Sequence, residues 1–210
     1  MQAISIAING IIAVMSVVAW LQLVLDARES QKLAARGWRS LKYFTVLSNL
    51  FSGGVSLTYV FYAIIFAGQV PMWLIILKLE AAAAVMLTFL TVVLLLGPYY
   101  DFKPMYEGGN LWMHAVLPLL ALLDCWLFVP VAQLPFWTTL CAMIPLVFYG
   151  IWYLARIVRH DVRPGDMTYD FYGFLRWGRD KIPAVMAGML VFSWVISLLI
   201  RLGSRLFGLG

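Results

Sequence analysis

The sequence predicts an all-α polytopic membrane protein with six transmembrane helices in one bundle. Of the 210 residues, 63% are apolar and only 12% are charged, whereas soluble domains are about half apolar. Six runs are long enough to cross a bilayer, which takes about 20 mostly apolar residues per helix. None of these runs alternates polar and apolar residues as a barrel strand does. Since backbone groups in lipid must bond within their own segment, helices are expected.

The spans are expected at residues 4–25, 41–66, 72–96, 111–130, 136–157 and 182–202. The stretches between them are too short for a second, soluble domain, so residues 1–210 are expected to form a single transmembrane domain. The first run has no Lys or Arg ahead of it and no small-residue cleavage site after it. We therefore expect it to remain as the first span and not to be a removed signal peptide.

The cations concentrate in three longer loops on one side of the predicted bundle. With their flanks, these loops hold Arg28, Lys32, Arg36, Arg39, Lys42, Lys103, Arg156, Arg159, Arg163, Arg176, Arg179 and Lys181. The loops at 67–71 and 131–135 hold none. The positive-inside rule then predicts a multi-pass protein of the cell membrane with the basic loops cytoplasmic and both termini outside, although Arg201 and Arg205 weigh mildly against this. The net charge of +5 fits contact with membrane lipids and predicts no nucleic-acid partner.

The informative residues are the polar groups within the spans, because each is costly in hydrocarbon and tends to face the bundle interior. They are Thr45, Ser48, Asn49 and Ser52 on the second span, Lys78 and Glu80 on the third, and His114 and Asp124 on the fourth. The chain has no Gly-rich phosphate loop, CxxC pair, HExxH or GxSxG motif. No metal or other cofactor is expected.

One polar layer is predicted near the basic loops. At about 1.5 Å of rise per residue, Thr45 lies roughly 6 Å inside the second span and His114 roughly 5 Å inside the fourth, and both spans start from the same face. Asn49 lies one turn deeper on the Thr45 face, with Ser48 beside it. Pro118, four residues after His114, removes the amide that would bond the His114 carbonyl and is expected to kink the helix.

A second polar layer is predicted nearer the opposite face. Lys78 and Asp124 each lie roughly 9 Å in from their span ends and are expected to form an ion pair, with Glu80 as a competitor for the lysine. Paired charges are the usual way in which a bundle tolerates them, so we expect a structural lock or the wall of a binding site. About 15 Å separates the layers, so Asp124 is not expected to orient His114.

Each residue of the first layer has a structural and a chemical interpretation. A Thr hydroxyl often bonds back to a carbonyl one turn earlier, Asn49 can join two helices, and His114 can be a structural donor or a proton relay. Together, however, Thr45 and His114 supply the nucleophile and base of acyl transfer, because a threonine hydroxyl reacts poorly until a base takes its proton. Asn49, and after it Ser48, are then candidates to stabilise the oxyanion.

Several of these residues also form a recognisable pattern. The YFT motif ending at Thr45, Asn49 four residues later, His114 near the start of a span with Pro118 after it, and the six-span layout resemble the androgen-induced-protein family, in particular bacterial-type members. The resemblance implies an integral-membrane threonine hydrolase of fatty-acid esters of hydroxy fatty acids. Its nucleophile and histidine carry over to Thr45 and His114, with a lipid ester from the bilayer as substrate and an acyl-threonine intermediate.

Two other function classes are open. In a proton-coupled transporter, His114, Glu80 and Asp124 would line a proton or solute pathway. The lack of an evident internal repeat or of paired broken helices weighs against this class. The second alternative is a non-catalytic membrane scaffold.

Overall fold

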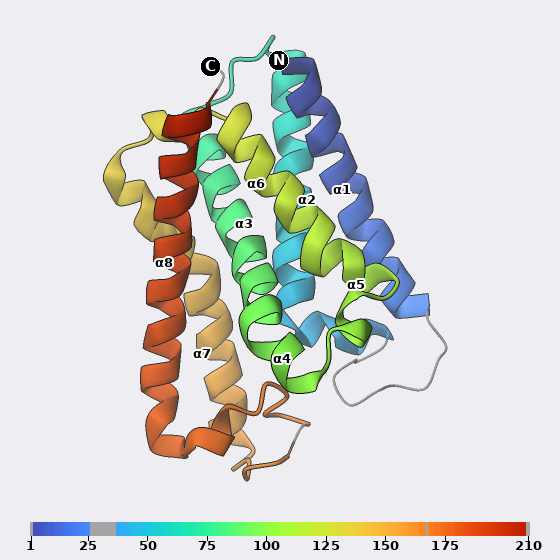
Figure 1. The fold of residues 1–210 in the computed structure, drawn as a ribbon, viewed down its shortest axis with the longest axis vertical. Coiled ribbons are helices and arrows are strands. Elements are labelled where there is room, and N and C mark those ends of the chain that lie inside the picture. Colours follow the sequence, from blue (N-terminus) through green and yellow to red (C-terminus); the bar gives the residue numbers. More distant parts are fainter. Residues whose placement is uncertain (1, 26–36, 167, 209–210) are drawn as a thin grey trace.

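The computed structural model describes residues 2–25, 37–166 and 168–208, which form an all-helical bundle (Figure 1). Within this part of the chain, six helices are long and apolar enough to cross a membrane, which confirms the predicted fold class. The elements, with η for short 3₁₀ or π-helical stretches, are α1 (Gln2–Leu25), η1 (Gly37–Lys42), α2 (Phe44–Ile65), α3 (Met72–Thr91), η2 (Val92–Leu96), α4 (Gly97–Tyr100), η3 (Lys103–Tyr106), α5 (Gly109–Leu111), η4 (Trp112–Val116), α6 (Leu117–Leu127), η5 (Val131–Gln133), η6 (Phe136–Met143), α7 (Ile144–Arg159), η7 (Phe174–Trp177), η8 (Arg179–Lys181) and α8 (Ile182–Phe207).

The helix α3 lies at the centre of the bundle and contacts α2, α6, α8 and η6 (Figure 1). All of its positions from Lys78 to Thr88 are buried. Four consecutive alanines, residues 81–84, occupy the middle of this stretch, and small residues let neighbouring helices approach closely in a membrane. The α1–α2 pair is equally close, because a Cβ atom on Gly53 would lie 1.9 Å from the Ser16 hydroxyl oxygen.

Three spans change their helix type along their length, and each change precedes a proline. The π-helical η2 precedes Pro98, the π-helical η4 precedes Pro118, and the 3₁₀ helix η6 precedes Pro145. A proline has no N–H for the carbonyl four residues earlier, so regular α-helical bonding fails in the preceding turn. The irregularity expected at Pro118 therefore takes the form of a π-helical turn, and this turn contains His114.

The two ends of the bundle differ in what they carry (Figure 1). One end, called the basic end below, holds residues 37–43, 97–108 and the described part of 160–181. The other, the terminal end, holds the first turn of α1, the last turn of α8 and residues 66–71 and 128–135. The described parts of the three basic loops thus share one end, whereas Arg28, Lys32 and Arg36 lie outside the described residues. The assignment of the basic end to the cytoplasm stays a prediction.

The second span begins later than predicted. Residues Gly37–Lys42 form the 3₁₀ helix η1, and Tyr43 is extended with φ −88° and ψ 135°, so α2 starts at Phe44 and not at Leu41. Thr45 is therefore the second residue of its helix and does not lie a full turn inside it. The fourth span runs from Gly109 to Leu127 and not from 111 to 130, and the sixth continues to Phe207. Thr45 is the second residue of its span and His114 the sixth, so the equal depth counted from the predicted span starts is wrong.

Candidate active site

Thr45 is half-buried at the start of α2, and its neighbours one turn on show which way it faces. Ser48 and Asn49 lie three and four residues beyond it, on either side of its direction around the helix. The Ser48 hydroxyl is 3.3 Å from the Thr88 hydroxyl of α3, and Asn49 Nδ2 donates to the Met113 carbonyl of η4 at 3.1 Å. Thr45 thus faces the interior of the bundle, where α2 meets α3 and η4.

The Thr45 hydroxyl has no hydrogen bond to any residue that the structure describes. The backbone carbonyl of Thr45, by contrast, accepts a hydrogen bond from the Ser48 hydroxyl at 3.1 Å and one from Asn49 Nδ2 at 2.8 Å. The back-bonding habit of polar residues in membrane helices is therefore seen at Ser48 and Asn49 and not at Thr45. The hydroxyl of Thr45 is left for another partner.

His114 is buried in the π-helical turn η4, with 8% of its surface exposed. Its Nδ1 lies 2.7 Å from the Met105 carbonyl of η3. Because a carbonyl can only accept, Nδ1 carries the proton of the neutral ring and Nε2 carries the lone pair. Nε2 has no hydrogen bond within the described chain, and no hydrogen bond joins His114 directly to Thr45. The imidazole is held in one tautomer with its basic nitrogen unoccupied.

Asn49 connects the start of α2 to the turn that holds His114. It is fully buried, and its Nδ2 serves the Thr45 and Met113 carbonyls together. A side-chain amide has two N–H donors, so both are committed, and Oδ1 is a buried atom with no partner among the described residues. As an oxyanion donor, the role predicted from the sequence, Asn49 would have to give up one of these bonds. The atom of Asn49 that lacks a partner, Oδ1, can only accept a hydrogen bond.

The start of α2 offers backbone donors that sequence reasoning missed. The first N–H groups of a helix have no acceptor within it. At α2, the Phe44 N–H donates to the Tyr172 hydroxyl oxygen at 3.0 Å, while the N–H groups of Thr45 and Val46 have no partner in the described chain. Two adjacent amides and the positive end of the helix dipole therefore lie beside the Thr45 hydroxyl. Backbone amides occur at every residue, so no sequence signal distinguishes them.

Residues from α7 and from segment 160–181 hold this helix start in place. Tyr149 of α7 donates to the Lys42 carbonyl at 2.7 Å, and Tyr172 accepts from Phe44. Tyr172 lies outside the spans, and burial raises its pKa to about 12. Both phenols bond to backbone groups at this helix start, which indicates a structural role for the two tyrosines.

The ion pair predicted for the second layer is present, with Lys78 Nζ 2.8 Å from Asp124 Oδ2. Asp124 also accepts from the Ser5 hydroxyl at 2.6 Å and from Asn9 Nδ2 at 2.8 Å, and Lys78 donates to Asn9 Oδ1 as well. All four side chains are buried. Ser5 and Asn9 were missed by sequence reasoning, although their spacing of four places both on one face of an otherwise apolar helix.

Glu80, the alternative partner of the lysine, stands apart from this cluster. It is 7% exposed, and its carboxylate has no hydrogen bond or ion pair to any described residue. Two positions from Lys78 on the helix, it points in another direction. Within the described chain, no group of three or more His, Cys, Asp or Glu side chains could hold a metal ion.

Comparison of the chain with family models, with curated proteins and with solved structures found no match in any of the three.

Proposed function

We propose that the protein is an intramembrane threonine hydrolase that cleaves a lipid ester, as the resemblance to the androgen-induced-protein family implies. The observation that carries the proposal is the state of His114. Its Nδ1 is bound to the Met105 carbonyl at 2.7 Å, which leaves Nε2 as a proton acceptor in the layer where the Thr45 hydroxyl lacks a partner. A base with a free lone pair and an unbonded hydroxyl at the same end of the bundle are the two groups that nucleophilic acyl transfer needs.

In the proposed reaction, Thr45 Oγ1 attacks the ester carbonyl while its proton passes to His114 Nε2. The resulting imidazolium returns the proton to the departing alcohol oxygen, and an acyl-threonine ester remains. Nε2 then takes a proton from a water molecule, whose oxygen attacks the acyl carbonyl. Cleavage releases the carboxylic acid and restores the Thr45 hydroxyl. The Met105 carbonyl stabilises the charged ring, since a hydrogen bond from an ionised donor is stronger.

We assign the oxyanion contact to the backbone N–H groups of Thr45 and Val46. Unpaired amides at a helix start can stabilise a developing negative charge without reorganising. Asn49 and Ser48, whose donors are already bonded, are assigned a positioning role: they hold Thr45 against α3 and η4. The substrate enters from the bilayer with its acyl chains against the apolar side chains of the bundle, and no cofactor takes part.

A fluorophosphonate probe tests the proposal, because it reacts with activated hydroxyl groups. The wild-type protein is expected to label, and Thr45→Ala and His114→Ala are expected to lose labelling, while Thr45→Ser retains it. Thr58→Ala is the matched control: this threonine lies on the same helix, but its hydroxyl bonds the Gly54 carbonyl at 2.9 Å. Equal labelling of wild type and the two alanine variants at Thr45 and His114 would remove the mechanism.

The unpartnered Glu80 favours one second candidate, a proton-coupled transporter. A buried carboxylate without a counterion in a membrane helix is a common mark of a proton or ion pathway. In that case Glu80→Gln would abolish proton flux in proteoliposomes, and the fluorophosphonate probe would not label Thr45. In the hydrolase, Glu80→Gln is expected to leave labelling unchanged.

A further inference from the structure

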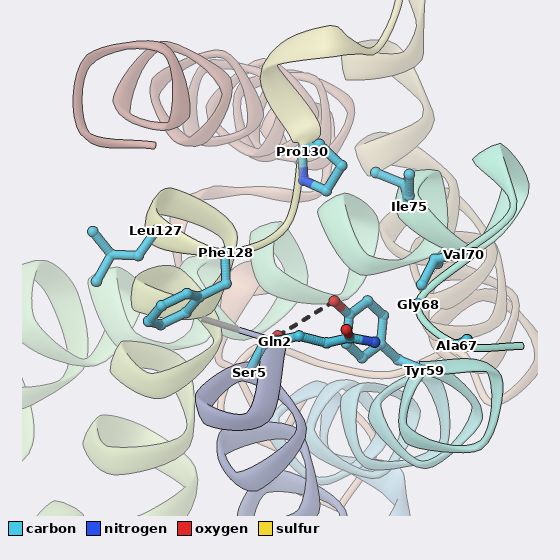
Figure 2. A pocket seen from close by; sticks show the side chains of 10 residues that line it. All are labelled: Gln2, Ser5, Tyr59, Ala67, Gly68, Val70, Ile75, Leu127, Phe128 and Pro130. Atoms are coloured by element: carbon cyan, nitrogen blue, oxygen red, sulfur yellow. Dashed lines mark hydrogen bonds between the residues drawn. The ribbon is translucent and has the colours of Figure 1, made fainter. Parts of the chain in front are cut away.

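A cavity of about 330 Å³ opens at the terminal end of the bundle (Figure 2). Its lining comes from the first turns of α1, the last part of α2, the 67–70 connection, α3 and the end of α6. Tyr59, one of the lining residues, lies on α2 about 21 Å beyond Thr45 along the helix axis. The cavity is thus distinct from the candidate active site.

The polar part of the cavity is formed by Ser5 and Tyr59, both buried. Their hydroxyl oxygens are 3.3 Å apart, as the dashed line in Figure 2 shows. Ser5 has one proton, and its short contact of 2.6 Å to Asp124 commits that proton to the carboxylate. O–H···O bonds are normally about 2.7–2.8 Å long, so the contact to Ser5 uses the Tyr59 hydroxyl only weakly. Tyr59 therefore retains a donor for a molecule in the cavity.

The charges behind this polar part cancel one another. Lys78 and Asp124 pair at 2.8 Å, and the ammonium group also lies 5.5 Å from the centre of the Tyr59 ring. Among the described residues, no charged side chain lines the cavity itself. An ionic ligand would lose its hydration here without gaining an unpaired counterion. The electrostatics therefore favour a neutral ligand.

The remaining walls are largely apolar. Leu127 and Phe128 lie on one side of the cavity, and Val70 and Ile75 on the other (Figure 2). Gln2 is also present, and its Nε2 donates to the Ala63 carbonyl at 3.2 Å, which leaves one amide N–H and Oε1. A few neutral polar groups against apolar walls suit a molecule with a small polar head and an apolar body.

We propose that this cavity binds a neutral amphiphile whose hydroxyl, ester or amide oxygen accepts a hydrogen bond from Tyr59 and whose apolar part packs against Ile75 and Phe128. The volume falls within the range of small-molecule sites, about 300–1,000 Å³. The site does not depend on the hydrolase activity, because no residue of the Thr45 layer lines it.

Photolabelling with dodecanol that carries a diazirine in its chain tests this site in the full-length protein. Attachment is expected within residues 67–75 and 127–130, and excess dodecanol should displace the probe far better than dodecane or ionised dodecanoate. Tyr59→Phe keeps the ring over Lys78 but removes the hydroxyl, so apparent affinity is expected to fall about fivefold, the loss of one hydrogen bond. Tyr62→Phe, on the same helix but outside the lining, is the matched control.

Ile75→Trp fills the cavity while keeping Tyr59 and should abolish the labelling. If size-exclusion chromatography shows that Tyr59→Phe does not fold, the Ile75→Trp variant alone tests whether the probe binds in the cavity. Equal competition by dodecane, attachment confined to other surfaces, or unchanged affinity in folded Tyr59→Phe would each overturn the proposal. Fluorophosphonate labelling of Thr45 reports separately on the proposed hydrolase.

Discussion

At the terminal end, Asp124 accepts from Ser5 and Asn9 and pairs with Lys78, which also bonds Asn9, so the polar atoms of the cluster have partners. At the basic end, the layer around Thr45 is left incomplete. There the threonine hydroxyl, His114 Nε2, Asn49 Oδ1 and two backbone amides have no partner among the described residues. Both layers lie within an apolar bundle, yet only in one of them do the polar side chains have their partners.

This difference separates a structural cluster from a candidate site. Leaving a buried polar group without a partner costs about 1–3 kcal/mol, and Asn49 Oδ1 is such an atom. The carbonyl oxygen of a bound ester could accept from the two backbone amides, and the Thr45 hydroxyl could donate to His114 Nε2, whereas the Lys78–Asp124 cluster has nothing left to offer. Substitutions at the terminal end should therefore lower stability, and substitutions at the basic end should mainly lower activity.

The largest expected effect on stability is that of Asp124→Ala. It leaves the Lys78 ammonium buried without its counterion, which costs about 3–5 kcal/mol. Denaturant unfolding in detergent measures the loss. The double variant Lys78→Met with Asp124→Leu removes both charges and is expected to recover most of it. If Asp124→Ala unfolds like the wild type, the cluster is not the structural lock inferred here.

Some parts of the molecule could be predicted from the sequence. The number of spans follows from the lengths of the apolar runs, because a bilayer sets the length of each helix. The Lys78–Asp124 pair could be predicted since buried charges must find each other and their depth can be counted along the helices. Ser5 and Asn9 were missed because short polar residues often bond to their own helix.

The features that were not predicted depend on backbone groups and on contacts between residues far apart in the sequence. The Met105 carbonyl orients His114, but a carbonyl has no side-chain signature. The start of α2 was misplaced because Leu41 extends the apolar run, whereas the extended backbone at Tyr43 breaks the helix. Tyr172 bonds an amide 128 positions away, and no local pattern indicates that its segment folds back to α2.

Asn49→Ala tests the role of Asn49 at the basic end. If Asn49 positions Thr45 and the His114 turn, its loss removes two hydrogen bonds, so ester hydrolysis should fall about tenfold, with a loss of stability of about 1–3 kcal/mol from the Met113 carbonyl left without its donor. Asn49→Leu should behave alike, because it keeps the size but lacks the donors. If Asn49 were the oxyanion donor predicted from the sequence, turnover would fall about 10²–10³-fold. Steady-state hydrolysis of a lipid ester separates the two outcomes.

Tyr172→Phe has the smallest expected effect. It removes the oxygen that accepts from the Phe44 N–H at 3.0 Å, so the start of α2 loses one hydrogen bond about one residue from Thr45. We expect about a fivefold loss of kcat with KM unchanged, because the bond holds the nucleophile and not the substrate. Tyr169→Phe is the matched control: its ring stacks on His160 at 4.0 Å, away from α2. A change confined to KM would instead place Tyr172 in contact with the substrate, and the basic end would then be larger than Thr45, Asn49 and His114 define it.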